Sequence, residues 1–338
     1  MTKNPTNNST KKTTNNTKNN STPIPPNNTI MKNTKNTKNT KKAKKHISGA
    51  AFTAPFLMLS VMIISFAGEF YVKRASAAGE NVFLSLCLVQ IIAFFAPALL
   101  YYQLKHRRLS TSMLISPMRI SHGVFIVFAS LLFFSGQLLL RYLMFKFWGI
   151  SAPTASAVPT DGVPAIQPIL ACCIVPALCE EFFFRGIILS EYRGYGLVKA
   201  IIISSLFFAF IHFSFSGFLI YLYAGFMLSF LTAVCRSVFP AIILHLANNV
   251  IDLYAGNVLD NLATNSSDMY FFRFLIVLIF LISLWRVFSR MQHIYLQYSE
   301  KPPKESLAIS KNAPQAAFRS WTLLLPIGAF LIITAISG

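Results

Sequence analysis

The sequence predicts an all-α protein, a polytopic membrane bundle of about eight or nine transmembrane helices. Of its 338 residues, 54% are hydrophobic and 12% are charged, whereas about a quarter of the residues in a soluble domain are charged. Phenylalanine alone occurs 32 times. The apolar residues gather into nine segments, most of which approach the roughly 20 residues that a membrane span needs. These observations indicate an integral membrane protein in a lipid bilayer.

Residues 1–46 form a low-complexity segment of Asn, Thr and Lys, which we expect to be a disordered cytosolic tail. Eleven of the 30 Lys and Arg residues lie in this tail, whereas all 11 acidic residues follow it, so the rest of the chain carries +8 of the total +19. The tail has no aromatic residue on which a base could stack, so no nucleic-acid partner is expected. Contact with anionic lipid headgroups and a tail without a partner both stay open.

The loops that connect the nine apolar segments alternate between the two sides of the membrane. Positive charges concentrate on the side of the tail, whereas the acidic loop 256–269 and the Ala- and Pro-rich loop 150–164 fall on the other side. The positive-inside rule therefore predicts a cytosolic N-terminus. The segments 239–255 and 321–337 are short for a span. The predicted segments are 47–71, 82–104, 122–145, 165–192, 197–213, 217–236, 239–255, 270–290 and 321–337.

The stretch Cys179-Glu180-Glu181-Phe182-Phe183-Phe184-Arg185 places three ionisable groups within a predicted span. Such groups are costly in a bilayer and usually serve chemistry or transport. Arg185 follows Glu181 by four residues, close to the same helix face, but it lies about 140° around the helix from Glu180. We therefore expect a Glu181–Arg185 ion pair that leaves Glu180 free to take a proton. A buried network of all three groups that only fixes helix packing is the alternative.

A second candidate pair is Phe208-x-x-x-His212 in the segment 197–213. The preceding span and this one form a hairpin that turns near Tyr195, from which Glu180 is 15 residues back and His212 is 17 residues on. At about 1.5 Å per residue the two side chains reach nearly equal heights on antiparallel helices. A carboxylate and an imidazole can meet there, although a lone histidine on an apolar helix is also common in a protein core.

A third polar group follows at His245, Asn249 and Asp252, whose spacing forms one stripe on a short helix. A neutral imidazole and an amide are suitable donors to a developing oxyanion. Asp252 either fixes the tautomer of His245 or lies at the outer interface. Counted from the flanking basic residues, His245 is about 6 Å shallower than His212, a mismatch that helix tilt or a deeper turn would have to absorb.

These motifs in this order resemble the CPBP family, which includes the type II CAAX prenyl endopeptidases and the Abi-like proteins of bacteriocin processing or immunity. The resemblance covers about residues 165–254. It implies an all-helical intramembrane protease in which Glu180 and His212 activate a water while His245 and Asn249 stabilise the oxyanion. Glu181, Arg185 and Phe208 are then supporting residues. The chain divides accordingly into the tail 1–46, N-terminal transmembrane helices 47–150, a catalytic core 165–255 and C-terminal transmembrane helices 256–338.

The family has also been described as metal-dependent, and Glu180, His212 and His245 would then be the zinc ligands. We favour a mechanism without a cofactor, although the sequence leaves zinc open. The sequence has neither an H-E-x-x-H zinc motif nor a G-x-S-x-G nucleophile motif. Five cysteines lie in apolar segments without zinc-ligand spacing and are interpreted as small hydrophobic residues. Cys179 is the one that could take part in the site, because it is next to Glu180. The others are Cys87, Cys172, Cys173 and Cys235.

The predicted function is an intramembrane endopeptidase that hydrolyses a peptide bond near the terminus of a membrane-associated peptide or protein substrate. Two alternatives use the same residues. The first is a non-catalytic immunity or scaffold protein of the same fold. The second is a proton-coupled transporter, since intramembrane Glu, His and Arg also build proton relays; such a protein often has two related halves, and this sequence shows none.

Overall fold

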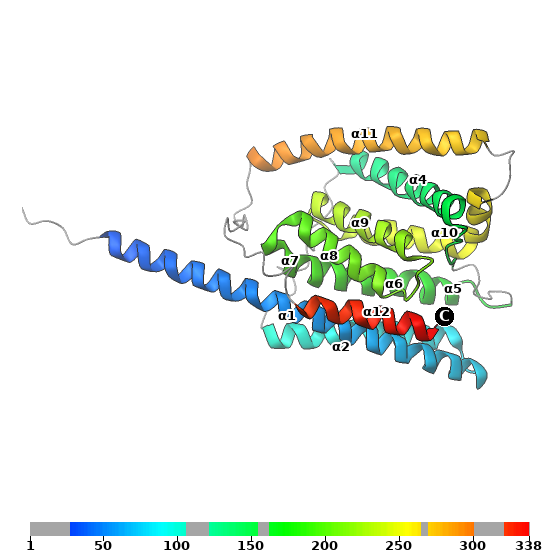
Figure 1. Cartoon of the computed structure of the whole chain (residues 1–338), viewed down its shortest axis with the longest axis horizontal. Helices are drawn as coiled ribbons and strands as arrows, with labels where there is room; N and C mark the ends of the chain where they lie inside the picture. Colours follow the sequence, from blue (N-terminus) through cyan, green and yellow to red (C-terminus); the bar gives the residue numbers. More distant parts are fainter. Residues whose placement is uncertain (1–27, 106–121, 155–161, 265–269, 301–320, 338) are drawn as a thin grey trace, which may run out of the picture. The chain divides into compact units, whose positions relative to one another are not determined.

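The computed structural model describes residues 28–105, 122–154, 162–264, 270–300 and 321–337, and these residues form helices without a single strand. The chain divides into two compact units, residues 1–43 and residues 44–338. The second unit holds the described helices that carry the predicted site (Figure 1). An all-α fold is therefore confirmed for the part of the chain that is described.

Helix α1 (Asn28–Ala77) begins well before the first predicted span. The expectation of a disordered tail is therefore wrong for residues 28–46, whereas residues 1–27 lie outside the described part. The physical reason is that a helix nucleated by the apolar segment extends at low cost, because each further residue adds one hydrogen bond. Lysine is also a good helix former.

Among the described residues, six helices are long and apolar enough to cross a membrane. The integral membrane character predicted from composition is thereby confirmed. Two further apolar helices, α8 (Leu197–Phe210) and the C-terminal pair of η8 (Trp321–Leu323) and α12 (Leu324–Ser337), are shorter. The six long helices are α1, with the apolar part 53–77, α2 (Val82–Lys105), α4 (Gly123–Trp148), α9 (Phe218–Cys235), α10 (Phe239–Thr264) and α11 (Tyr270–Glu300).

The predicted span 165–192 is a continuous helical run that changes type several times. The segments are α5 (Ile166–Pro168), η3 (Ile169–Ile174), α6 (Val175–Phe183), η4 (Phe184–Ile188), α7 (Leu189–Tyr192) and η5 (Arg193–Tyr195), of which η3 and η4 are π-helical. The two π-helical segments flank the Glu-Glu motif, and π-turns are frequent at functional sites. Ser204 on α8 donates to the carbonyl of Phe184 at 3.2 Å, which gives this carbonyl of η4 a second donor beside the backbone N–H of Leu189.

Helices α2, α8, α9 and α10 surround the run 166–195 and position its polar groups. Packing contacts join α2 and α10 to α6, while α8 contacts α7, η4 and α9 (Figure 1). Gly225 on α9 permits the close approach of α8, because a Cβ there would lie 3.0 Å from Cα of Ser205 and 3.1 Å from Cβ of Phe208. Helix α4 in turn packs between α9 and α11.

Two predicted boundaries were wrong. Helix α10 continues to Thr264, so the part of the expected loop 256–269 up to that residue is helical. Helix α8 ends at Phe210, so His212 lies in the turn after the helix and not on the span predicted at 197–213. Neither end is marked by a proline or glycine at the boundary itself, the residues that most strongly signal the end of a helix.

Candidate active site

The predicted ion pair between Glu181 and Arg185 is present. The Arg185 Nη1 atom lies 2.8 Å from Oε1 of Glu181, and both side chains are fully buried. Arg185 also donates through Nη2 to the carbonyl of Gly225 at 3.2 Å, and its guanidinium lies 4.8 Å from the centre of the Phe208 ring. Carboxylate, carbonyl and aromatic face together compensate a charge that would otherwise be costly in this interior.

Glu180 has a different partner from Glu181, as the helical spacing predicted, because it contacts Gln90 while Glu181 pairs with Arg185. Its Oε1 accepts a hydrogen bond of 2.7 Å from Nε2 of Gln90 on α2. Its Oε2 is buried and has no hydrogen-bond partner among the described residues. Nε2 of His245 lies 3.9 Å from this Oε2, a separation that a small molecule such as water can bridge.

His245 bridges the two glutamates from α10. Its Nδ1 lies 2.8 Å from Oε1 of Glu181, and its Nε2 faces Glu180. Glu181 is paired with Arg185 and is therefore an acceptor, so Nδ1 of His245 must carry the hydrogen. The Nε2 atom of a neutral His245 is then an acceptor and cannot donate. The expectation that a neutral His245 donates to an oxyanion is therefore wrong for Nε2, which donates only when His245 is protonated.

Asp252 does not hold the tautomer of His245, a role that falls to Glu181. Asp252 instead lies 3.4 Å from Nη2 of Arg141 on α4, and Asp260 lies 3.6 Å from Nη1 of the same guanidinium. Arg141 and Asp252 line a separate cavity of about 160 Å³ between α4 and α10. Asp252 thus belongs to this separate ion pair, and its position at the outer interface stays a prediction.

His212 lies beyond the end of α8 and is held from two sides. Its Nδ1 is 2.8 Å from the carbonyl of Phe208, so Nδ1 donates and Nε2 is left as an acceptor in the neutral ring. Its ring stacks on Tyr221 of α9 at 3.8 Å between centroids. The next residue, Phe213, has a φ of 44°, which is unusual for a bulky side chain and indicates local strain.

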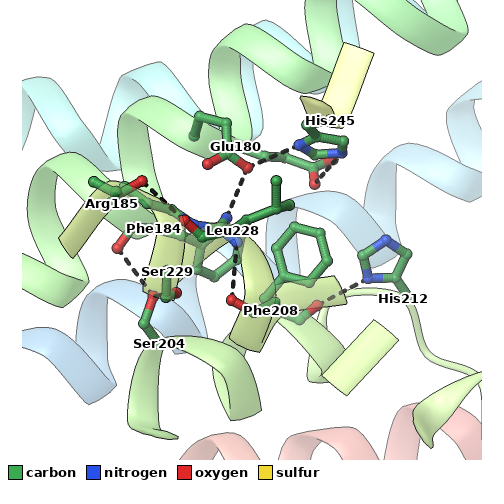
Figure 2. A network of polar contacts seen from close by, with 12 residues as sticks. Glu180, Phe184, Arg185, Ser204, Phe208, His212, Leu228, Ser229 and His245 are labelled. Carbon is green, nitrogen blue, oxygen red and sulfur yellow. Dashed lines mark hydrogen bonds and ion pairs between the residues drawn. The ribbon is translucent and has the colours of Figure 1, made fainter. Parts of the chain in front are cut away.

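The ring of Phe208 lies at the centre of these groups. Its centroid is 5.0 Å from the imidazole of His212 and 5.6 Å from that of His245 (Figure 2). The two histidines therefore belong to one site. Within the described residues, however, no hydrogen bond or ion pair joins His212 to Glu180, and the carboxylate that the hairpin geometry paired with His212 contacts His245 instead.

Asn249 follows His245 by one helical turn on α10 and is partly buried. The neighbouring Asn248 has a different environment, because its side-chain oxygen accepts a hydrogen bond of 2.9 Å from Gln137 of α4. Asn249 makes no such bond within the described part of the chain and keeps its amide available.

Residues 162–251 match the family model described as type II CAAX prenyl endopeptidase Rce1-like. The resemblance to the CPBP family is confirmed over this segment. The matched segment is thus similar to a domain of a membrane protease family, and it contains both glutamates, both histidines and Asn249. Neither a curated protein nor a solved structure matches the chain.

The residues that would hold zinc do not fit a three-ligand site in this arrangement. Glu180 and His245 face each other, but His212 does not complete a group with them, and no cluster of three His, Cys, Asp or Glu side chains suited to a metal occurs among the described residues. A catalytic zinc needs three protein ligands around one point. The cysteines do not supply one either, since Cys179 is buried and belongs to no such cluster.

Two residues of the site were missed by the sequence analysis. Gln90 lies outside the protease segment, on α2, and its contact with Glu180 joins residues 90 positions apart. Tyr221 lies within the segment but reads as one of many aromatic residues on an apolar helix. A polar glutamine in the middle of a predicted span is the signal that could have identified Gln90.

Proposed function

We propose that this protein is an intramembrane endopeptidase in which Glu180 activates a water for attack on a peptide bond of a membrane-associated substrate. One observation carries the proposal: Oε2 of Glu180 is buried, lacks a hydrogen-bond donor among the described residues and faces Nε2 of His245 at 3.9 Å. A carboxylate oxygen left in this way suits a general base, which must lie within reach of the proton that it removes.

The charges of the site support this role. Two carboxylates and one guanidinium leave one negative charge, which a single proton shared between Glu180 and His245 cancels in the low-dielectric interior. With that proton on His245, Glu180 is a free base and Nε2 of His245 becomes a donor. Glu181 then stabilises the imidazolium through its contact with Nδ1.

The chemical steps follow from these positions. Water attacks the scissile carbonyl carbon while one of its protons passes to Oε2 of Glu180, with Nε2 of His212 as a further acceptor that orients the water. The oxyanion that forms receives hydrogen bonds from Nε2–H of His245 and from the amide of Asn249, because such preorganised donors stabilise developing charge. The C–N bond then breaks, and the proton on Glu180 passes to the leaving amine.

Phe208 and the ion pair hold this arrangement together. The Phe208 ring contacts both imidazoles and the Arg185 guanidinium, so one side chain sets the positions of three groups. For the substrate we propose a membrane-associated peptide or protein, cleaved near a terminus; a prenylated C-terminal peptide and a leader peptide are both of this class. The N-terminus is proposed to be cytosolic from the distribution of positive charge.

The test compares protein termini in membranes from cells with the unaltered protein and with Glu180→Gln, His212→Ala or His245→Ala. Each variant should lose the same new termini, by a factor of about 100 or more as expected for loss of a catalytic base or donor, while its abundance in the membrane stays unchanged. Glu80→Gln, in an exposed turn, is the matched control for the charge change. Full biological activity of Glu180→Gln would favour the immunity or scaffold alternative. If Glu181→Gln is stable but inactive while Glu180→Gln is active, Glu181 is the catalytic base and Glu180 the supporting residue.

A further inference from the structure

Helix α2 reaches the candidate site although another long helix, α4, lies between it and the protease segment 162–251 in the sequence. It packs against α6 and η3 and contributes the side chain of Gln90 to the site. The amide nitrogen of this side chain lies 2.7 Å from Oε1 of Glu180. An amide that donates to a carboxylate makes a charge-assisted hydrogen bond, which is stronger than one between neutral groups.

Because of this bond, the two carboxylate oxygens of Glu180 have different roles. Oε1 is occupied by Gln90, so the carboxylate plane is fixed and Oε2 is left facing His245. A glutamate side chain has three rotatable bonds, and the loss of its one donor would let it rotate among several positions. Catalysis by a base depends strongly on such alignment, since small displacements of a reacting group can cost about 100-fold in rate.

The register of α2 against α6 is fixed by aromatic packing around this contact. Phe94, one turn after Gln90, packs edge-on against Phe183 at 5.6 Å and Phe184 at 6.0 Å, while Phe95 stacks on Phe182 at 5.3 Å. The three phenylalanines that follow the Glu-Glu motif therefore dock on the helix that delivers Gln90.

Helix α1 adds a second constraint on the same part of α2. A Cβ at Gly68 would meet the side chain of Val89, the residue before Gln90. The absence of a side chain at Gly68 therefore lets α1 support α2 at close range, directly behind the glutamine.

We propose that Gln90 is a positioning residue that orients Glu180 for catalysis, so that the catalytic apparatus extends from the protease segment to the second span. The role in catalysis rests on the function proposed above, whereas the contact itself can be tested without a substrate. Gln90 acts only through Glu180 and has no contact with the reacting atoms in this scheme.

The first experiment measures the contact alone. Dicyclohexylcarbodiimide reacts with protonated carboxyl groups in apolar surroundings, and a donor to the ionised carboxylate slows this labelling. We expect Glu180 in Gln90→Leu to be labelled about 10-fold faster or more than in the unaltered protein, the lower end of what a hydrogen bond to a charged group supplies. Gln103→Leu, at an exposed position on the same helix, is the matched control. Equal labelling rates in Gln90→Leu and the unaltered protein overturn the proposal.

The second experiment measures the kinetics of cleavage of a prenylated CAAX peptide in proteoliposomes. Gln90→Leu should lower kcat about 10- to 100-fold with KM little changed, because the substrate does not contact Gln90. Gln90→Glu keeps the size of the side chain, so it guards against a folding defect. Its activity relative to that of the unaltered protein should rise as the pH falls, since a protonated carboxyl donates again. An unchanged kcat in Gln90→Leu refutes the positioning role.

The two experiments separate the two proposals. Faster labelling in Gln90→Leu, in a preparation whose unaltered form cleaves no membrane peptide, refutes the proteolytic function and supports the contact. Cleavage that is lost in Glu180→Gln but unaffected in both Gln90 variants supports the proteolytic function and overturns the role of Gln90.

Discussion

Replacement of Arg185 by Leu should strongly destabilise the protein, because it removes the positive charge from a pair with no access to solvent. The pair distance is 2.8 Å and both side chains are fully buried. Removing one partner of such a pair leaves an uncompensated charge and typically costs about 3–5 kcal/mol. The hydrogen bond from Arg185 to the carbonyl of Gly225 is lost as well, and a hydrogen bond to a charged group contributes about 1.5–3 kcal/mol.

These costs approach the whole stability of many proteins, about 5–15 kcal/mol. The double variant Arg185→Leu with Glu181→Gln removes both charges and keeps an acceptor for Nδ1 of His245. It should regain at least about 2 kcal/mol of the loss, because the uncompensated carboxylate is the larger part of the cost. The double variant should still have impaired catalysis, since a protonated His245 would lose its counter-charge.

The assay is fluorescence-detected size exclusion of detergent extracts after heating, which reports the folded fraction without a substrate. Arg74→Leu, an exposed arginine near the end of α1, is the control for loss of a positive charge. The reasoning fails if Arg185→Leu is as stable as the unaltered protein, or if the double variant is no more stable than Arg185→Leu alone.

Two further predictions concern packing around the site. Phe330 of α12 contacts three aromatic side chains, Phe215 within the loop 211–217 and Phe210 and Phe218 on either side of it. At about 0.5–1.5 kcal/mol for each aromatic pair, Phe330→Ala should increase hydrogen exchange in that loop and lower activity, whereas the exposed Leu331→Ala should do neither. Equal exchange in both variants would show that α12 does not support the loop. A Cβ at Gly225 would meet backbone atoms of α8, so Gly225→Ala should lower the stability by about 1–3 kcal/mol in thermal unfolding. Gly328→Ala, with no atom near its Cβ, should be neutral. An unaffected Gly225→Ala would mean that α8 and α9 can move apart without cost.

The sequence predicted the contacts that depend on one helix. The Glu181–Arg185 pair and the separate partner of Glu180 follow from the 100° rotation per residue, and the structure contains both. The apolar spans were likewise accessible, because length and composition alone determine them. Local periodicity therefore identified the ionisable groups and which of them share a helix face.

Contacts between helices were predicted less well, because depth and rotation of neighbouring helices are set by packing that the sequence does not display. Residue counting placed His212 opposite Glu180 and His245 too shallow, yet His245 contacts both glutamates. The counting assumed that α8 continues through His212, whereas it ends at Phe210 and the chain turns. Gln90 could not be assigned by spacing at all, since its partner lies 90 residues away.

The polar groups of the site form one chain of contacts across four helices, and this arrangement explains how a buried carboxylate can stay reactive. Gln90 from α2 binds one oxygen of Glu180, while Arg185, Glu181 and His245 are linked in sequence from η4 through α6 to α10. Two carboxylate oxygens of this chain of contacts are buried without a hydrogen-bond partner among the described residues, Oε2 of Glu180 and Oε2 of Glu181. A network that served only packing would gain by satisfying both, since an unpaired buried oxygen costs about 1–3 kcal/mol. The carboxylate of Glu181 is paired with Arg185 at 2.8 Å, whereas Oε2 of Glu180 faces Nε2 of His245 at 3.9 Å, and this difference favours Glu180 as the catalytic base.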